Sequence, residues 1–248
     1  MAVVLVTGGS GTLGSHLAPL LRGSGHEVRV LSRRAGRGTH VGDLNDGAGV
    51  AEAATGAEVV VHLASDTRRL GRKDQLQTGN LLSAVKQARL LVYISIVGID
   101  RIPYAYYRRK LACEATIASS GVPFTILRAT QFHELIALGL RAVERLPVAP
   151  LPVDFRFQPV AAAEVAARLS ELVDSAPGGR VEDMGGPQVL SLGDLAQTWS
   201  RRRGRPRRVV RLPLPGRAAA AFRQGLNTCP EHMTSGQTWD EYVSSTVP

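Results

Sequence analysis

The sequence predicts an α/β protein built on a doubly wound parallel sheet. Short apolar runs alternate with amphipathic stretches through the first half of the chain, and a glycine-rich turn joins the first run to the first amphipathic stretch. Alternating strands and helices are typical of parallel sheets whose two faces are covered by helices. Because ligands of such sheets bind beyond the carboxyl ends of the strands, the informative residues are expected directly after each apolar run.

Six strands are expected before residue 130. They cover residues 2–6, residues 28–31, a short run ending near residues 42–43, and residues 58–63, 90–95 and 123–128. The fourth run is nearly all apolar, as a strand buried on both faces should be. Helices are expected between the strands, for instance over residues 75–87 and 107–119.

The apolar pattern loosens after Arg128, where prolines begin to cluster. Further helices are expected over residues 161–173 and 192–199, with a turn at residues 185–187. We therefore assign residues 1–135 to the core that carries the sheet and residues 136–248 to a small substrate-side subdomain. The subdomain is expected to interleave partly with the core, so that the two form a single compact unit.

The glycine-rich turn begins at Thr7 and reads Thr-Gly-Gly-Ser-Gly-Thr-Leu-Gly. Gly8 permits the sharp turn, Gly11 lets a pyrophosphate approach the backbone, and Gly14 lets the helix pack closely on the strand. The free N–H groups and the positive end of that helix then face the phosphates. The turn therefore predicts a dinucleotide site; the alternative is a tight turn in another kind of α/β protein. The residues expected to hold the phosphates are Gly8, Ser10, Gly11, Thr12, Leu13 and Gly14.

The residues after the second strand indicate which dinucleotide is bound. Sites that select NAD usually carry an acidic residue there, whereas a 2′-phosphate needs positive charge. This chain has Ser32 followed by Arg33 and Arg34. A guanidinium can form two charge-assisted hydrogen bonds to a phosphate. We therefore expect NADPH to be preferred over NADH; the alternative is a pair of ordinary surface arginines.

Four more residues follow the third and fourth strands and are expected to contact the cofactor. Asp43 could accept a hydrogen bond from the adenine amino group, or it could simply cap a turn or helix. Leu44 lies beside it, and Ala64 and Ser65 follow the fourth strand.

Tyr106 and Lys110 lie four residues apart after the fifth strand, where a helix should begin. That spacing puts both side chains on one face of the helix. Beside a nicotinamide, the ammonium group lowers the pKa of the phenol and holds the ribose, while the phenol exchanges a proton with a carbonyl oxygen as hydride moves. We expect Tyr106 and Lys110 to be catalytic, with Lys110 also contacting the cofactor.

With these motifs the chain resembles the short-chain dehydrogenase/reductase superfamily, in its atypical NmrA-like branch. The resemblance covers most of the chain. It also rests on residues 42–44, 61–64, 93–95, 127–132, 158–160, 164–166 and 185–187. It implies a Rossmann-type fold with a bound nicotinamide dinucleotide. Members of the superfamily include reductases of ketones, quinones and enones, and redox-sensing regulators that keep the cofactor.

The chain departs from the superfamily pattern at Ile96. Superfamily enzymes usually carry two serines after the fifth strand, and the second polarises the substrate carbonyl. Here Ser95 matches the first serine and Ile96 occupies the place of the second. Isoleucine cannot donate a hydrogen bond, and losing such a donor typically costs about 2.7–4 kcal/mol of transition-state stabilisation. Ser95 could donate instead, or it could cap the end of the strand.

Ile96, Phe132 and His133 are expected to line the substrate pocket. The alternative for His133 is a packed or solvated histidine. A helical zinc site that used His133 and Glu134 would need a second histidine at position 137, which is Ala137. We therefore expect no metal.

Composition limits the other possibilities. The chain of 248 residues has a net charge of +9, which is almost entirely due to arginine. Its densest cluster, residues 201–208, lacks interleaved aromatic residues, so we expect an exposed loop and no nucleic-acid partner. No apolar run approaches the roughly 20 residues of a membrane helix, and the N-terminal run is too short for a signal peptide. Cys113 and Cys229 fit no metal spacing and suit a reducing compartment, so we expect a cytoplasmic protein.

The sequence thus favours an NADP-dependent oxidoreductase that transfers hydride between the nicotinamide and a small apolar carbonyl, quinone or enone. The alternative is an NADP(H)-binding redox sensor with little turnover, which the isoleucine at position 96 keeps open. The sequence does not identify the substrate or the oligomeric state.

Overall fold

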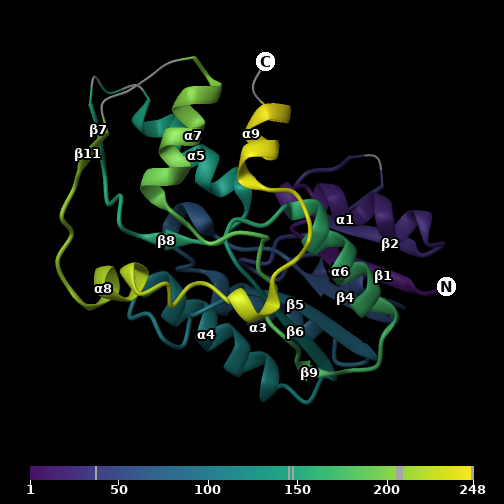
Figure 1. Ribbon diagram of the computed structural model, residues 1–248. Coiled ribbons are helices and arrows are strands. Elements are labelled where there is room, and N and C mark those ends of the chain that lie inside the picture. Colours follow the sequence, from purple (N-terminus) through teal and green to yellow (C-terminus); the bar gives the residue numbers. More distant parts are fainter. Residues whose placement is uncertain (37, 145, 147, 205–208, 247–248) are drawn as a thin grey trace. The chain divides into compact units, whose positions relative to one another are not determined.

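The computed structural model describes residues 1–36, 38–144, 146, 148–204 and 209–246 (Figure 1). Its chain forms two units. The first unit contains Met1–Ser95, Ala105–Arg128 and Ala163–Glu182, and the second contains Ile96–Tyr104, Ala129–Ala162 and Asp183–Pro248. Residues 163–182, which follow the division expected near residue 135, belong to the first unit, and that division remains a prediction.

The first unit carries a seven-stranded parallel sheet, which confirms the predicted fold class. The strand order is β3-β2-β1-β4-β5-β6-β9. The strands are β1 (Val3–Thr7), β2 (Glu27–Ser32), β3 (Thr39–Val41), β4 (Val59–His62), β5 (Leu90–Ile96), β6 (Phe124–Ala129) and β9 (Gly179–Arg180). The order reverses beside β1, as in doubly wound folds that bind ligands at that point.

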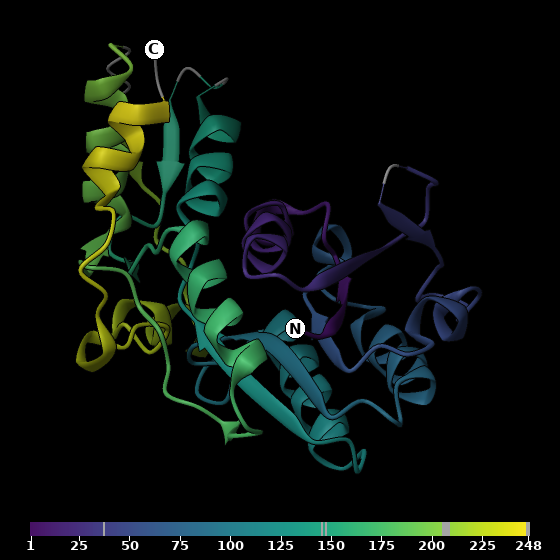
Figure 2. The same ribbon diagram turned by 90° about the vertical axis from the view of Figure 1, so that its right-hand side faces the viewer.

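Helices cover both faces of this sheet. They are α1 (Thr12–Gly23), α2 (Val50–Ala54), α3 (Asp74–Ala84), α4 (Ala105–Ala118) and α6 (Ala162–Asp174), with a short 3-10 helix, η1 (Thr67–Arg69), before α3. One core cluster joins α2, α3 and α4 to the sheet through residues such as Leu81, Cys113 and Ile117. Figure 2 shows α1 and α6 on the opposite face.

Strand register aligns the carboxyl ends of the central strands. Thr7 pairs with Leu31 on one side and with His62 on the other, and His62 pairs with Tyr93. The loops that leave β1, β2 and β4 therefore begin at one edge of the sheet, where the sequence predicted the site.

The second unit contains helices and two small sheets. Its helices are α5 (His133–Val143), α7 (Leu192–Arg202), α8 (Arg217–Arg223) and α9 (Trp239–Thr246), with the 3-10 helix η2 (Pro230–His232). Strand β7 (Ala149–Leu151) pairs in parallel with β11 (Val209–Arg211), and β8 (Arg156–Phe157) pairs antiparallel with β10 (Leu190–Ser191).

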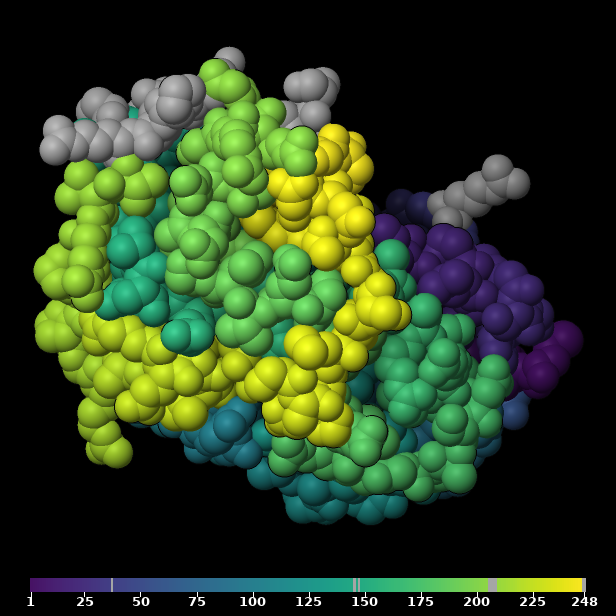
Figure 3. Space-filling model, viewed as in Figure 1, coloured from purple at the N-terminus to yellow at the C-terminus, as the bar shows by residue number. Residues whose placement is uncertain are grey.

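An aromatic core holds α5, α7 and α9 together. The rings of Trp199 and Trp239 stack with centroids 6.0 Å apart, and the Trp239 indole donates a hydrogen bond to the Leu195 carbonyl. The side chains of α7 and α9 lie against each other on the face shown in Figure 3. These buried indoles hold the three helices in one cluster.

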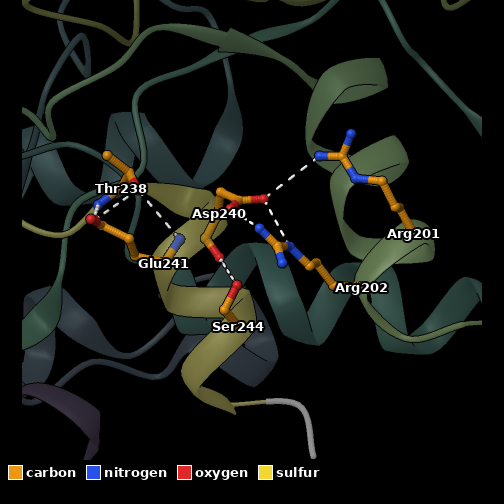
Figure 4. A network of polar contacts seen from close by, with 6 residues as sticks. All are labelled: Arg201, Arg202, Thr238, Asp240, Glu241 and Ser244. Carbon is orange, nitrogen blue, oxygen red and sulfur yellow. Dashed lines mark hydrogen bonds and ion pairs between the residues drawn. The ribbon is translucent and has the colours of Figure 1, made fainter.

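The expectation of an exposed loop over residues 201–208 is wrong for its first residues. Arg201 and Arg202 form the last turn of α7 and pair with Asp240 of α9 (Figure 4). Helix α7 extends this far because arginine is a good helix former and basic side chains favour the C-terminal end of a helix dipole. Residues 205–208 lie outside the described residues.

No helix in the described ranges is both long and apolar enough to span a membrane.

Candidate functional site

The glycine-rich turn forms a tight bend between β1 and α1. Gly8 has a φ of +69°, and a Cβ there would lie 2.7 Å from the Ala64 nitrogen at the end of β4. A Cβ on Gly14 would lie 2.4 Å from the Gly9 Cα. Both positions therefore exclude larger side chains, for the geometric reasons that the sequence predicts.

The N-terminus of α1 offers free donors. Gly11 is the N-cap residue, and among the described residues no side chain caps the helix. The Gly11 N–H donates to the Gly8 carbonyl at 3.0 Å, and the first backbone bond of the helix runs from the Ser15 N–H to the Gly11 carbonyl. The N–H groups of residues 12–14, in the first turn, therefore have no acceptor within the helix. Ser10, Gly11 and Thr12 are exposed, whereas Leu13 is buried beneath them. These features fit the pyrophosphate of a dinucleotide.

Arg33 and Arg34 follow directly after β2, as expected. Both are exposed, and neither side chain bonds to another residue in the described part of the chain. The Ser32 hydroxyl accepts a hydrogen bond from the Arg34 backbone N–H at 3.1 Å, which fixes the start of this loop. Two guanidinium groups therefore remain available to an anionic ligand at the end of β2.

Asp43 caps its own turn. One carboxylate oxygen accepts bonds from the backbone and the side-chain nitrogen of Asn45, at 2.9 and 2.6 Å. The Leu44 carbonyl accepts a bond from Asn80 of α3 at 2.8 Å. This is the geometry of the turn-capping alternative, and adenine contact by Asp43 remains a prediction.

A buried histidine, His62, links elements at the carboxyl ends of the central strands. His62 of β4 has Thr7 of β1 2.7 Å from its Nδ1 and Thr78 of α3 3.1 Å from its Nε2. Burial, reinforced by the nearby positive charge of Lys110, lowers the pKa of His62 to about 3. His62 is therefore neutral at physiological pH and acts as a rigid bridge between β1, β4 and α3.

Tyr106 is in the first turn of α4, and its hydroxyl reaches Ser65. The two oxygen atoms are 3.2 Å apart, and Ser65 in turn donates to the Asp74 carboxylate at 2.6 Å. The second Asp74 oxygen accepts from the Asp66 backbone N–H at 2.7 Å. The structure thus brings together Tyr106 and Ser65, which the sequence predicted separately, and adds Asp74.

Lys110 lies on the same helix as Tyr106 but points into the protein. Its side chain is 3% exposed, donates to the Ile94 carbonyl at 3.2 Å and lies 4.3 Å from the ring centre of Tyr93. Burial lowers the pKa of Lys110, and the negative charge of Asp74 partly offsets this effect. The ammonium group is therefore fixed at the end of β5, one helical turn from Tyr106.

The three residues predicted for a substrate pocket belong to the second unit. Ile96 and Phe132 are half-buried, and Phe132 is the N-cap residue of α5. His133 is fully buried: its ring stacks on Tyr242 with centroids 4.9 Å apart, and its Nε2 lies 3.0 Å from the Gln237 carbonyl. This is the packed alternative for His133, and its role in a pocket remains a prediction.

Sequence reasoning missed Asp74. It lies just after a basic segment at the start of α3, where an acidic residue is ordinary helix chemistry. Ser95 also differs from the capping alternative: it is 3% exposed, and its hydroxyl finds no partner among the described residues.

Comparison with protein families matches residues 8–175 to a family described as NAD(P)H-binding. The chain belongs to this NAD(P)H-binding family. The match covers the glycine turn, Tyr106 and Lys110.

Solved structures share the fold of this NAD(P)H-binding protein. An NADPH-dependent quinone oxidoreductase from Escherichia coli, in complex with NADPH, is 18% identical with a TM-score of 0.82, and the alignment covers 98% of this chain and 99% of that one. A short-chain dehydrogenase/reductase superfamily protein from Agrobacterium tumefaciens with bound NAD is 19% identical with a TM-score of 0.72, covering 98% of this chain and 95% of that one. At such identities the similarity establishes the fold.

Curated relatives are longer. An uncharacterized protein from Mycobacterium tuberculosis is 28% identical over 190 residues, which cover 70% of this chain. The chain spans about a fifth of the length of that relative, since the match covers 21% of it.

Proposed function

We propose that this NAD(P)H-binding protein is an NADP-dependent oxidoreductase that reduces a small apolar carbonyl, quinone or enone. The observation that carries the proposal is the position of Tyr106, half-buried in the first turn of α4, with Lys110 one turn further along. The uncapped α1 and the glycine bend fit a dinucleotide on the same unit, and the bound nicotinamide would supply the hydride.

The chain's own residues would then manage the proton. Tyr106 donates its hydroxyl proton to the substrate oxygen as that oxygen gains negative charge, which is general acid catalysis. The fixed ammonium of Lys110 stabilises the phenolate left behind. Hydrogen bonding of the Tyr106 hydroxyl to Ser65 gives the donor a defined starting position.

Arg33 and Arg34 support the preference for NADP. Their guanidinium groups are exposed at the end of β2, where the ribose 2′ position lies in folds of this type. The quinone reductase of the same fold is described as NADPH-dependent, which agrees with this preference.

The second candidate is an NADP(H)-binding redox sensor with little turnover. Ile96 favours it, because this side chain cannot polarise a carbonyl. NADPH oxidation should therefore be followed over a panel of ketones, quinones and enones with the wild type and Tyr106→Phe. The enzyme proposal predicts a fall in turnover of about 10²–10⁴-fold with NADPH affinity almost unchanged. Cofactor binding without turnover on any compound would favour the sensor.

A further inference from the structure

The loop between β4 and α3 is built around the Tyr106 side chain. A Cβ on Gly71 would lie 3.0 Å from two carbon atoms of the Tyr106 ring and 3.1 Å from an Asp74 carboxylate oxygen. The Arg109 guanidinium donates to the Leu70 carbonyl at 2.7 Å, which ties the loop to α4 a second time. The loop therefore packs on the phenol ring itself.

Leu70 pays a conformational cost for this packing. Its φ is +53°, and among the described residues it is the sole non-glycine residue with a positive φ. A leucine in the left-handed region is strained, and such strain persists only where surrounding contacts enforce it. The Leu70 carbonyl is held by the Arg109 guanidinium and the Leu70 N–H donates to the Thr67 carbonyl at 3.1 Å. The next residue, Gly71, is the one that comes close to the Tyr106 ring.

Hydrogen-bond directions in this loop are determined by Asp74. The Asp74 side chain is 2% exposed, and as a carboxylate it can only accept. Ser65 donates its hydrogen to Asp74 at 2.6 Å, a length typical of a charge-assisted bond. The Ser65 oxygen is then left as an acceptor for the Tyr106 hydroxyl 3.2 Å away.

We propose that Ser65, which follows β4, and Asp74, which begins α3, are a positioning pair for Tyr106. The pair cannot polarise a carbonyl, because the Ser65 hydrogen is committed to Asp74. It holds the phenol protonated and pointed at Ser65 until a substrate oxygen competes for that hydrogen. The catalytic meaning of the pair rests on the proposed oxidoreductase function, whereas its control of the Tyr106 proton does not.

Other charged and titratable groups surround Tyr106 and enter its titration. Asp66 lies on the loop and Asp74 at the start of α3, Lys110 and Arg109 lie on α4, and Tyr93 lies on β5. Removing Asp74 also removes one of the negative charges that act on Lys110, beside that of Glu114. Variants of Ser65 are therefore the cleaner test, because they leave every charge in position.

The test is the pH at which the Tyr106 hydroxyl ionises, followed by the ultraviolet absorbance of tyrosinate. The signal of Tyr106 is obtained by subtracting the titration of the same protein carrying Tyr106→Phe. Ser65→Ala removes the acceptor of the neutral phenol and should lower its midpoint by about one pH unit, a tenfold change in equilibrium. Ser65→Thr keeps the hydroxyl and should restore the wild-type midpoint. Asp74→Asn should also lower the midpoint, since a neighbouring negative charge holds a phenol protonated. Asp66→Asn makes the same charge change one residue from Ser65 and should have the smaller effect.

Turnover gives a second readout. Ser65→Ala should reduce kcat about tenfold with KM unchanged, and Ser65→Thr should recover it. A midpoint that is the same in wild type, Ser65→Ala and Ser65→Thr overturns the pair, whatever the activity. Shifted midpoints in a protein that turns over no substrate support the pair and contradict the oxidoreductase proposal.

Discussion

The imidazole ring of His62 stacks on the phenol ring of Tyr93, with centroids 5.3 Å apart and planes at 30°. The contact joins β4 to β5 at the carboxyl end of β4, where the loop that carries Ser65 begins. Each ring nitrogen of His62 has a threonine hydroxyl as its hydrogen-bond partner, so the neutral ring has both of its polar atoms satisfied.

Acid should destabilise the protein through His62. Its pKa is lowered to about 3 in the folded chain, against about 6.5 in the unfolded chain. Between these values the unfolded state binds a proton that the folded state does not, so stability falls as pH falls, by about 1.4 kcal/mol per pH unit. Urea unfolding at pH 4 to 7 measures this slope. His62→Gln should flatten it, whereas His40→Gln, at an exposed position in β3, should not. Equal slopes in all three proteins would contradict the assignment.

Gly14 and Gly23 should respond oppositely to alanine, although both belong to α1. A Cβ on Gly14 would overlap backbone atoms of Gly8 and Gly9, so the turn must shift. We expect Gly14→Ala to cost about 1–3 kcal/mol of stability and at least tenfold in NADPH affinity. A Cβ on Gly23 meets nothing within 4 Å, and alanine there should stabilise by up to about 1 kcal/mol. Thermal melts and cofactor titrations would check both, and tight NADPH binding by Gly14→Ala would be the contrary result.

Cofactor selectivity should depend on Arg33. A charge-assisted hydrogen bond is worth about 1.5–3 kcal/mol, so NADPH should bind at least tenfold more tightly than NADH. Arg33→Ala should remove most of that difference by weakening NADPH alone. Arg168→Ala, on the surface of α6, is the matched control and should change neither affinity. Fluorescence titration of both cofactors measures this, and equal dissociation constants in the wild type would rule the preference out.

The arginines at the end of α7 should be dispensable for the cofactor. Arg201 and Arg202 are exposed and pair with Asp240 within the second unit. Replacing both with serine should leave NADPH affinity within about threefold, because exposed charges that are already paired within their own unit are screened by solvent. Arg203 differs, since it pairs with Glu144 at 2.9 Å and lies over the Trp199 ring, so Arg203→Ser should lower the melting temperature more. A large loss of affinity in the Arg201→Ser, Arg202→Ser double variant would contradict this view.

The regular part of the fold is readable from the sequence because local signals and burial agree there. The apolar run at residues 58–63 became β4, and the glycine turn became the bend before α1. Strand β9 escaped notice because it has only two residues, Gly179 and Arg180, and pairs with β6 through tertiary context. Strand β9 and helix α6 both belong to the segment, residues 163–182, that returns to the first unit.

Within the candidate site, too, some residues could be predicted from local sequence and others could not. Gly8 and Gly14 can be recognised in the sequence because only glycine fits their backbone positions. The bonds from Tyr106 to Ser65 and from Ser65 to Asp74 join residues 41 and 9 positions apart, and no periodic pattern encodes such contacts. For His133 the sequence leaves a pocket residue and a packed residue both open, and only the structure shows the stacking of its ring on Tyr242.

The chain leaves the first unit after Ser95, re-enters it at Ala105, and crosses again at Arg128, Ala162 and Glu182. Neither unit is one uninterrupted stretch of polypeptide, so neither can be expressed alone as one continuous segment of the chain. Truncation near residue 135 would strip α6 and β9 from the sheet. Each unit therefore depends on chain segments that are separated in the sequence by segments of the other unit.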